Sequence, residues 1–215
     1  MIAISKKTKE KITEQIQIVV NKYLEKADTK PKANSANPFV MALLKDFDPL
    51  MHRIHGLKTS LGCEMEKIAE IIAIESWGKN NVRRKFRENV TLPSNVYQII
   101  DSIIDDLSNA RTLSHYENEK NKILNAIKKP STQFLSHTYE FDLELKDNTN
   151  NEIYCLEMKG PDPNTTEVPG AKRRLLAALA NNVLQHRDYE VNSLLAIYYN
   201  NKFPKPYKNA KVLYY

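Results

Sequence analysis

The amino-acid sequence predicts an α/β (α+β) protein in which helices flank a mixed central β-sheet and the N-terminal half is helical. Apolar residues recur at helical spacing up to about position 130, and strand-like alternation begins only after it. A helical pattern then separates two strand-like segments, which is typical of a sheet that contains a parallel crossover.

Five helices are expected in the first half of the chain. The second of them is expected to start at Asn37-Pro38, because an N-cap residue followed by proline in the first turn favours a helix start. The third is expected to open near Ser60 or Gly62 and to end at Trp77. The others are expected over 5–27, from Pro93 to about 107, and over 116–128.

Strands are expected in the second half. From Tyr139 to Lys146 apolar and charged residues alternate strictly, and Ile153 to Lys159 reads as a second strand after a polar turn. The two segments therefore predict a hairpin. A helix over 171–186 and further strands over 193–199 and 210–215 complete the expected order.

The length of 215 residues favours one domain, here predicted as a single domain over 1–215. It comprises an N-terminal helix and linker (1–36), a helical region (37–130) and a sheet core (131–215).

The composition favours a cytoplasmic protein without membrane segments. Two cysteines, Cys63 and Cys155, are too few for a disulfide framework. The start of the chain lacks the apolar stretch of a signal peptide, and the run Ile71 to Ile74 is far too short to span a membrane.

The charge distribution suggests a protein that binds a polyanion and also a cation. The net charge is +6. An acidic strip from Glu140 to Glu152 lies between basic segments at Lys79 to Glu88 and after Gly160, although charge blocks on a solvated surface would look the same.

The chemistry is expected on the hairpin. Glu157 and Lys159 share a face of their strand, and closure of the turn at 148–151 would bring Asp142 beside Glu157. Magnesium takes hard oxygen ligands and commonly uses only one or two carboxylates. We therefore predict that Asp142 and Glu157 bind Mg²⁺ and that Lys159 orients or deprotonates the attacking water. Glu144 and Lys146 have the same spacing and are the alternative pair.

Two segments resemble the PD-(D/E)xK nuclease motif: Tyr139 to Asp142, with Phe141 in the position of proline, and Leu156 to Lys159. The residues that follow, Gly160 to Asn164 and Ala171 to Arg173, resemble type II restriction endonucleases of the TdeIII kind. Upstream, the segments at 37–39, 59–62 and 66–69 are also similar to that family.

The resemblance implies the nuclease fold for the sheet, a further carboxylate from the long helix and a GGNCC-like recognition site. Glu66 matches the family position, with Glu70 and Glu75 as alternatives. DNA contacts are expected from the basic segments and the loop before the last helix. These candidates are Asn164, Thr165, Lys172, Arg173, Arg174, Arg83 and Arg84.

The leading hypothesis is a Mg²⁺-dependent type II restriction endonuclease that cuts double-stranded DNA as a homodimer, since a two-fold protein matches a palindromic site. A repair or junction nuclease with the same motif is one alternative. A non-catalytic DNA-binding protein with a structural acidic strip is the other.

Overall fold

The computed structural model describes residues 4–27, 48–160 and 167–198, and the chain divides into two units, Met1–Glu75 and Ser76–Tyr215. The predicted helix at Asn37-Pro38, the predicted strand over 210–215 and the loop residues Asn164 and Thr165 lie outside the described residues.

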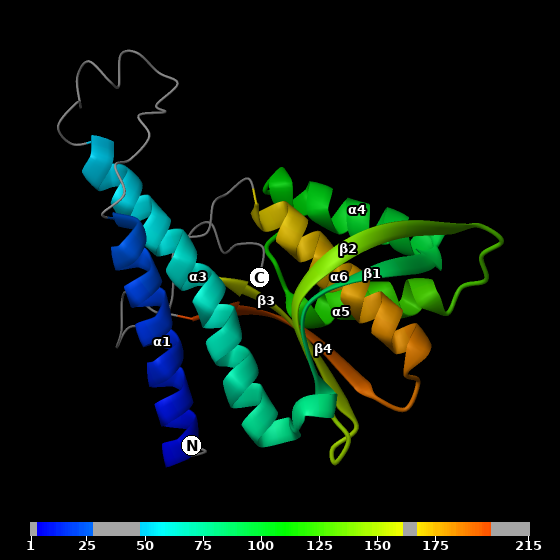
Figure 1. Ribbon diagram of the computed structural model, residues 1–215. Coiled ribbons are helices and arrows are strands. Elements are labelled where there is room, and N and C mark those ends of the chain that lie inside the picture. Colours follow the sequence, from blue (N-terminus) through cyan, green and yellow to red (C-terminus); the bar gives the residue numbers. More distant parts are fainter. Residues whose placement is uncertain (1–3, 28–47, 161–166, 199–215) are drawn as a thin grey trace. The chain divides into compact units, whose positions relative to one another are not determined.

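The first unit is built on two long helices, α1 (Lys6–Ala27) and α3 (Asp48–Trp77), which run side by side in blue and cyan in Figure 1. Val19, Ile68 and Ala73 are buried, and the Gln15 amide donates a hydrogen bond of 2.5 Å to the Glu64 carboxylate, which joins the two helices. The prediction of α1 is confirmed. The helix α3 begins about three turns earlier than predicted, at Asp48-Pro49, where proline in the first turn suits a helix start.

The second unit contains a four-stranded sheet in the order β1-β2-β3-β4 (Figure 1). The strands are β1 (Val82–Pro93), β2 (Phe134–Asp147), β3 (Glu152–Lys159) and β4 (Glu190–Ile197). β1 pairs antiparallel with β2 and β2 antiparallel with β3, whereas β3 and β4 are parallel, with the helix α6 (Val168–Gln185) between them in the chain. The predicted mixed α/β fold is confirmed.

The strand β1 corrects the prediction of a helical region over 37–130, because it places a strand between two of its helices. After the short 3-10 helix η1 (Lys79–Asn81), every second residue from Val82 to Leu92 is less exposed than its neighbours. That face carries Arg84 and Glu88 among its apolar residues, so a search for apolar alternation misses the period of two.

The ladder between β1 and β2 is interrupted opposite Asp142. The register pairs Arg84 with Leu143 and Phe86 with Phe141 but skips Lys85, whose φ of +48° lies in the left-handed region. Arg83 stacks over the Phe86 ring and also bonds Glu144 of β2, while the register on either side of Lys85 stays the same. The alternation predicted along Tyr139 to Lys146 is seen in the burial of β2, where Phe141, Leu143 and Leu145 are buried and the charged residues between them are half-buried.

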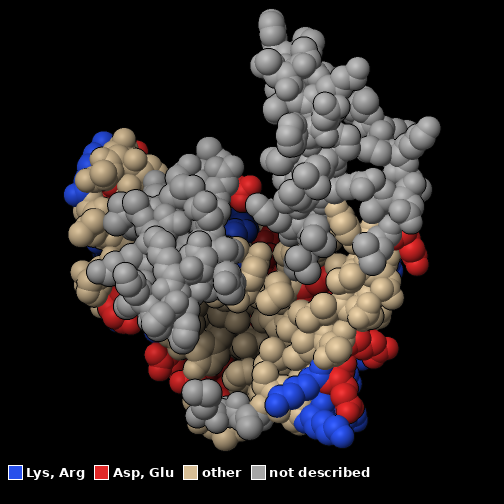
Figure 2. Space-filling view, turned by 90° about the vertical axis from the view of Figure 1, so that its left-hand side faces the viewer, with Lys and Arg blue, Asp and Glu red and all other residues tan. Residues whose placement is uncertain are grey.

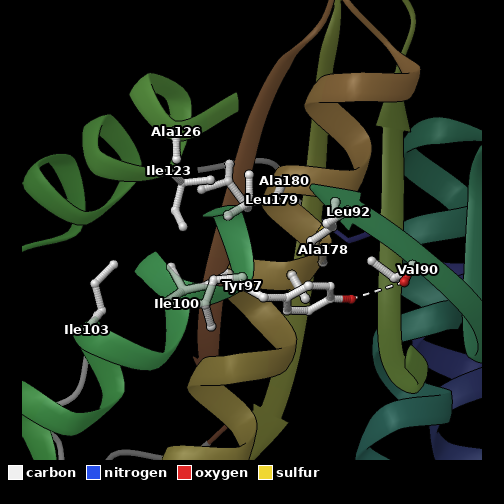
Figure 3. Packing of buried hydrophobic residues seen from close by; sticks show 14 of the residues in the cluster. Val90, Leu92, Tyr97, Ile100, Ile103, Ile123, Ala126, Ala178, Leu179 and Ala180 are labelled. Carbon is white, nitrogen blue, oxygen red and sulfur yellow. Dashed lines mark hydrogen bonds between the residues drawn. The ribbon is translucent and has the colours of Figure 1, made fainter. Parts of the chain in front are cut away.

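The core lies between the sheet and three helices that contact one another: α4 (Ser94–Ser108), α5 (Tyr116–Ile127) and α6. Figure 3 shows Ile100, Ile123 and Leu179 in this cluster, each fully buried. The Tyr97 hydroxyl donates a hydrogen bond of 3.0 Å to the Val90 carbonyl, so the one polar atom of this ring is satisfied in the core. The predictions of α4, α5 and α6 are confirmed.

The turn between β2 and β3 sets the register of the hairpin. The Asp147 carboxylate accepts hydrogen bonds from the backbone N–H groups of Thr149, at 2.9 Å, and Asn150, at 3.1 Å. Asn151 takes the left-handed φ of +54° that asparagine tolerates better than most residues. The hairpin closes at the predicted position.

Candidate active site

The hairpin brings Asp142 and Glu157 side by side. Leu143 pairs with Leu156, so the next position of the register places Asp142 beside Glu157. The Asp142 carboxylate also accepts a hydrogen bond of 2.8 Å from the backbone N–H of Met158, which fixes its position where the β1–β2 ladder is interrupted.

Glu157 is almost completely enclosed, with 2% of its surface exposed, and two cations hold its carboxylate. The Lys159 ammonium lies 2.9 Å from one carboxylate oxygen. Arg174 on α6 bonds both oxygens: its Nε donates to Oε2 at 3.1 Å, and its Nη2 donates to Oε1. The buried charge is thus compensated, as a buried carboxylate requires.

The environment of Asp142 disfavours a negative charge. Burial raises the pKa of its carboxyl group, and the neighbouring Glu157 charge raises it further. The Met158 N–H, Lys159 and Arg174 act in the opposite direction and lower that pKa. Two carboxylates held this close in a partly enclosed place favour a bound cation.

A hollow opens beside these residues on the second unit. Its lining combines the two carboxylates with bases and neutral groups: Thr138, Tyr139, Glu140, Asp142, Glu157, Lys159, Gly170, Arg173 and Arg174. Glu140 is turned to Arg87, whose Nε donates to it at 2.9 Å, so Glu140 is partly neutralised at the rim.

The residues present fit a magnesium ion bound through two carboxylates. No group of three or more His, Cys, Asp or Glu side chains with metal-binding geometry occurs in the described ranges 4–27, 48–160 and 167–198. Magnesium keeps several waters and commonly uses one or two protein carboxylates, which is the number that Asp142 and Glu157 supply.

The alternative pair, Glu144 and Lys146, is arranged differently. Glu144 accepts hydrogen bonds from Arg83 and from the Asn182 amide, both at 3.1 Å. The Lys146 ammonium lies 4.5 Å from the centre of the Tyr189 ring. The hollow that contains Asp142 and Glu157 is lined by neither of them. The geometry favours Glu157 and Lys159 as the chemical pair.

The three consecutive bases at the start of α6 bond three different carboxylates. Lys172 is 3% exposed and pairs with the buried Glu119 of α5, so its burial favours a packing role over DNA contact. Arg173 pairs with Asp101 of α4 and stays partly exposed at the hollow. Arg174 holds Glu157.

The bases of β1 are more accessible. The Arg83 side chain is 51% exposed while it bonds Glu88 and Glu144, and Arg84 is half-buried. On the face of the molecule in Figure 2, basic and acidic side chains lie beside one another. DNA contact by Arg83 and Arg84 stays a prediction.

The three helix glutamates lie on α3 in the first unit, and their catalytic role stays a prediction. Glu66 is half-buried. Hydrogen bonds from the side chains of Ser5 and Thr8 lower the pKa of the Glu75 carboxyl group, so Glu75 helps to join α3 to the start of α1.

Two buried polar residues that join α6 to β1 and β2 were missed in the sequence. Asn181 and Asn182 are buried on α6, and their amides donate to Glu88, at 2.8 Å, and to Glu144, at 3.1 Å. Two adjacent asparagines inside an apolar helix pattern were the available signal, because a buried amide needs polar partners.

The family of the chain follows from comparison with known proteins. The model of the HinfI family, described as type II restriction endonuclease, matches residues 4–214. The chain belongs to the HinfI family. The HinfI match supports the predicted restriction-endonuclease class but not the TdeIII-like subtype.

One curated relative is similar to most of the chain. The type II restriction enzyme MjaII of Methanocaldococcus jannaschii is 27% identical over 190 residues, which is 80% of this HinfI-family chain and 49% of MjaII. The chain thus spans about half the length of that relative. No solved structure matches the chain. Among the described helices, none combines the length and apolar character needed to cross a membrane.

Proposed function

We propose that this HinfI-family protein cleaves double-stranded DNA in a sequence-specific, Mg²⁺-dependent reaction. The observation that carries the proposal is the convergence of Asp142, Glu157 and Lys159 in one hollow, at positions that resemble the PD-(D/E)xK motif. The family match and the similarity to a type II restriction enzyme support the same activity.

In this proposal the chain's residues divide the work. Asp142 and Glu157 hold the metal ion, which supplies Lewis-acid activation of the phosphate and its attacking water. The Lys159 ammonium lies 2.9 Å from the Glu157 carboxylate, which holds the lysine in place, and the side chain is 22% exposed. The ammonium can therefore reach a water at that carboxylate. Glu66 is proposed as the assisting carboxylate.

DNA binding is assigned to the accessible bases around the hollow. Arg173 at the hollow and Arg83 and Arg84 on β1 are proposed to contact phosphates, because guanidinium groups bind phosphate oxygens in pairs. Arg174 is proposed as a further phosphate ligand, and Asn164 and Thr165 as readers of base edges.

A homodimer that cuts both strands of a palindromic site is proposed on symmetry grounds, because each subunit then acts on one strand. The GGNCC-like site followed from the TdeIII resemblance alone, so the HinfI match gives it no support.

The decisive experiment incubates plasmid DNA with the protein in Mg²⁺ and, as a control, in EDTA. We expect discrete fragments that require the metal, with Asp142→Asn as a matched variant that produces none. Metal-dependent nicking or smearing would indicate a less specific nuclease. Retarded but uncut DNA would indicate a binding protein and overturn the proposal.

A further inference from the structure

Arg174 occupies the carboxylate that the metal ion needs. Its Nε lies 3.1 Å from Oε2 of Glu157, and its Nη2 bonds Oε1, so the guanidinium engages both oxygens. Bidentate arginine–carboxylate pairs are among the stronger hydrogen-bonded contacts in proteins. The Glu157 carboxylate is 2% exposed, so few other directions of approach are open to a cation.

The charges around the hollow balance only while Arg174 is present at Glu157. Asp142 and Glu157 supply two negative charges, and Lys159 and Arg174 supply two positive charges. A divalent cation added to this set would leave it strongly positive. Without Arg174, the two carboxylates and Lys159 carry a net negative charge, which suits a divalent cation.

The remaining contacts of the two carboxylates do not depend on Arg174. The Met158 N–H still donates to Asp142, and Lys159 still lies 2.9 Å from Glu157. The side chain of Arg174 is 30% exposed, so it has solvent into which it can swing from its place on α6. The site can therefore lose Arg174 without losing the arrangement of its metal ligands.

We propose that Arg174 closes the metal site of the free protein by competing with the divalent cation for the Glu157 carboxylate. This rests on the proposed function, since it takes Glu157 as a metal ligand. Arg174 is then a positioning residue whose release from Glu157 precedes metal binding. A guanidinium that has left Glu157 is free to bind a phosphate, and it cannot engage both anions at once.

The test measures the affinity of the DNA-free protein for Mn²⁺, by electron paramagnetic resonance of unbound Mn²⁺. Arg174→Gln is expected to bind Mn²⁺ about tenfold or more tightly than the wild type, since a charge-assisted competitor is removed. Arg174→Lys keeps the positive charge beside Glu157 but cannot form the two-pronged contact, so it is expected to bind Mn²⁺ more tightly than the wild type, by a smaller factor.

The matched control is Arg173→Gln. It removes the same charge from the same hollow, one residue away, but from a side chain that bonds Asp101. A general change of the electrostatic field would raise the Mn²⁺ affinity of Arg173→Gln and Arg174→Gln alike, whereas competition raises it mainly in Arg174→Gln. Thermal unfolding of each variant verifies that the fold persists.

Unchanged or weaker Mn²⁺ binding by folded Arg174→Gln or Arg174→Lys would overturn the proposal, because an arginine that only shapes Glu157 would help the metal. Equal gains in Arg173→Gln would overturn it as well. Failure of the proposed metal site is recognised separately: Glu157→Gln and Asp142→Asn would then leave the Mn²⁺ affinity at the wild-type value.

Discussion

Two segments of the hairpin each contain a glutamate and a lysine separated by one residue, yet their side chains have different surroundings. On β2, Glu144 bonds Arg83 and the neutral amide of Asn182, and Lys146 lies over the Tyr189 ring. On β3, Glu157 is 2% exposed, bonds Lys159 and Arg174, and lies beside Asp142.

The difference lies in the neighbours and not in the spacing. Glu144 and Lys146 contact different partners: Arg83 and Asn182 bond the glutamate, and the Tyr189 ring lies beside the lysine. Glu157 and Lys159 bond each other at 2.9 Å, and the register of the hairpin brings Asp142 beside Glu157. A short motif acquires chemical meaning only when a second element completes it.

The largest expected effect concerns the two glutamates. Glu157→Gln and Asp142→Asn should abolish cleavage of plasmid DNA in Mg²⁺, because each removes a charged metal ligand. Glu144→Gln is the matched control and should cleave at nearly the wild-type rate, since Glu144 does not line the hollow and the glutamine oxygen can still accept one of the two hydrogen bonds, from Arg83 or from Asn182. If Glu144→Gln were inactive and Glu157→Gln active, Glu144 and not Glu157 would be the metal ligand.

The two lysines should differ by a smaller but clear factor. Lys159→Arg is expected to lose about a hundredfold or more in single-turnover cleavage, since a guanidinium stays protonated and has a different reach. Lys146→Arg should change little, because arginine also stacks over the Tyr189 ring. Near-normal cleavage by Lys159→Arg would reduce Lys159 to an ion-pair partner of Glu157.

The carboxylate beside Glu157 should also affect stability. The pKa of Asp142 is raised in the folded protein, chiefly by burial and then by the Glu157 charge. The folded state therefore binds this proton more tightly than the unfolded state, and ionisation of Asp142 lowers stability as the pH rises from the ordinary aspartate pKa through the raised value.

In the metal-free protein, Asp142→Asn should accordingly raise the melting temperature at neutral pH, because the amide carries no charge and can still accept from the Met158 N–H. The gain should shrink as the pH falls below the ordinary aspartate pKa, where Asp142 is protonated in both states. Melting curves of both proteins across that range check the sign. A gain that grows on acidification would contradict it.

The last comparison concerns the stability contributed by the arginine partner of each glutamate. The Arg83 side chain is 51% exposed, so Arg83→Ala should lower the free energy of unfolding by less than about 1 kcal/mol. Arg174→Ala leaves the buried Glu157 with Lys159 alone and should cost more, up to about 3–5 kcal/mol if the pair behaves as a fully buried one. Chemical denaturation measures the free energy of unfolding of both variants. Equal losses would show that the burial of Glu157 does not make its arginine partner more important for stability.

The hairpin was predictable because its information is local. The polar turn fixes the register within a few residues, and the register brings Asp142 to Glu157. The strand β1 was hidden by charged residues on its less exposed face, which have partners supplied by distant segments: Glu88 accepts from Asn181 of α6.

The partners of the basic residues at 172–174 could not be inferred from the sequence. Lys172, Arg173 and Arg174 are consecutive, but they bond Glu119, Asp101 and Glu157, which belong to three different elements. Their partners depend on how α6 packs against α4, α5 and β3, and that packing is set by contacts far apart in the chain. When this packing is unknown, three consecutive basic residues suggest a DNA-binding segment.

The pairing of β1 with β2 has a consequence for how the second unit folds. The ladder joins Val82 to Leu145 and Pro93 to Phe134, with α4 and α5 between the two strands in the chain. Closing such a long intervening segment costs entropy before any strand contact forms, whereas helices and the short β2–β3 hairpin need only local contacts. We expect the helices and the hairpin to form first and the β1–β2 ladder to close late, so that Asp142 meets Glu157 within the hairpin before the sheet is complete.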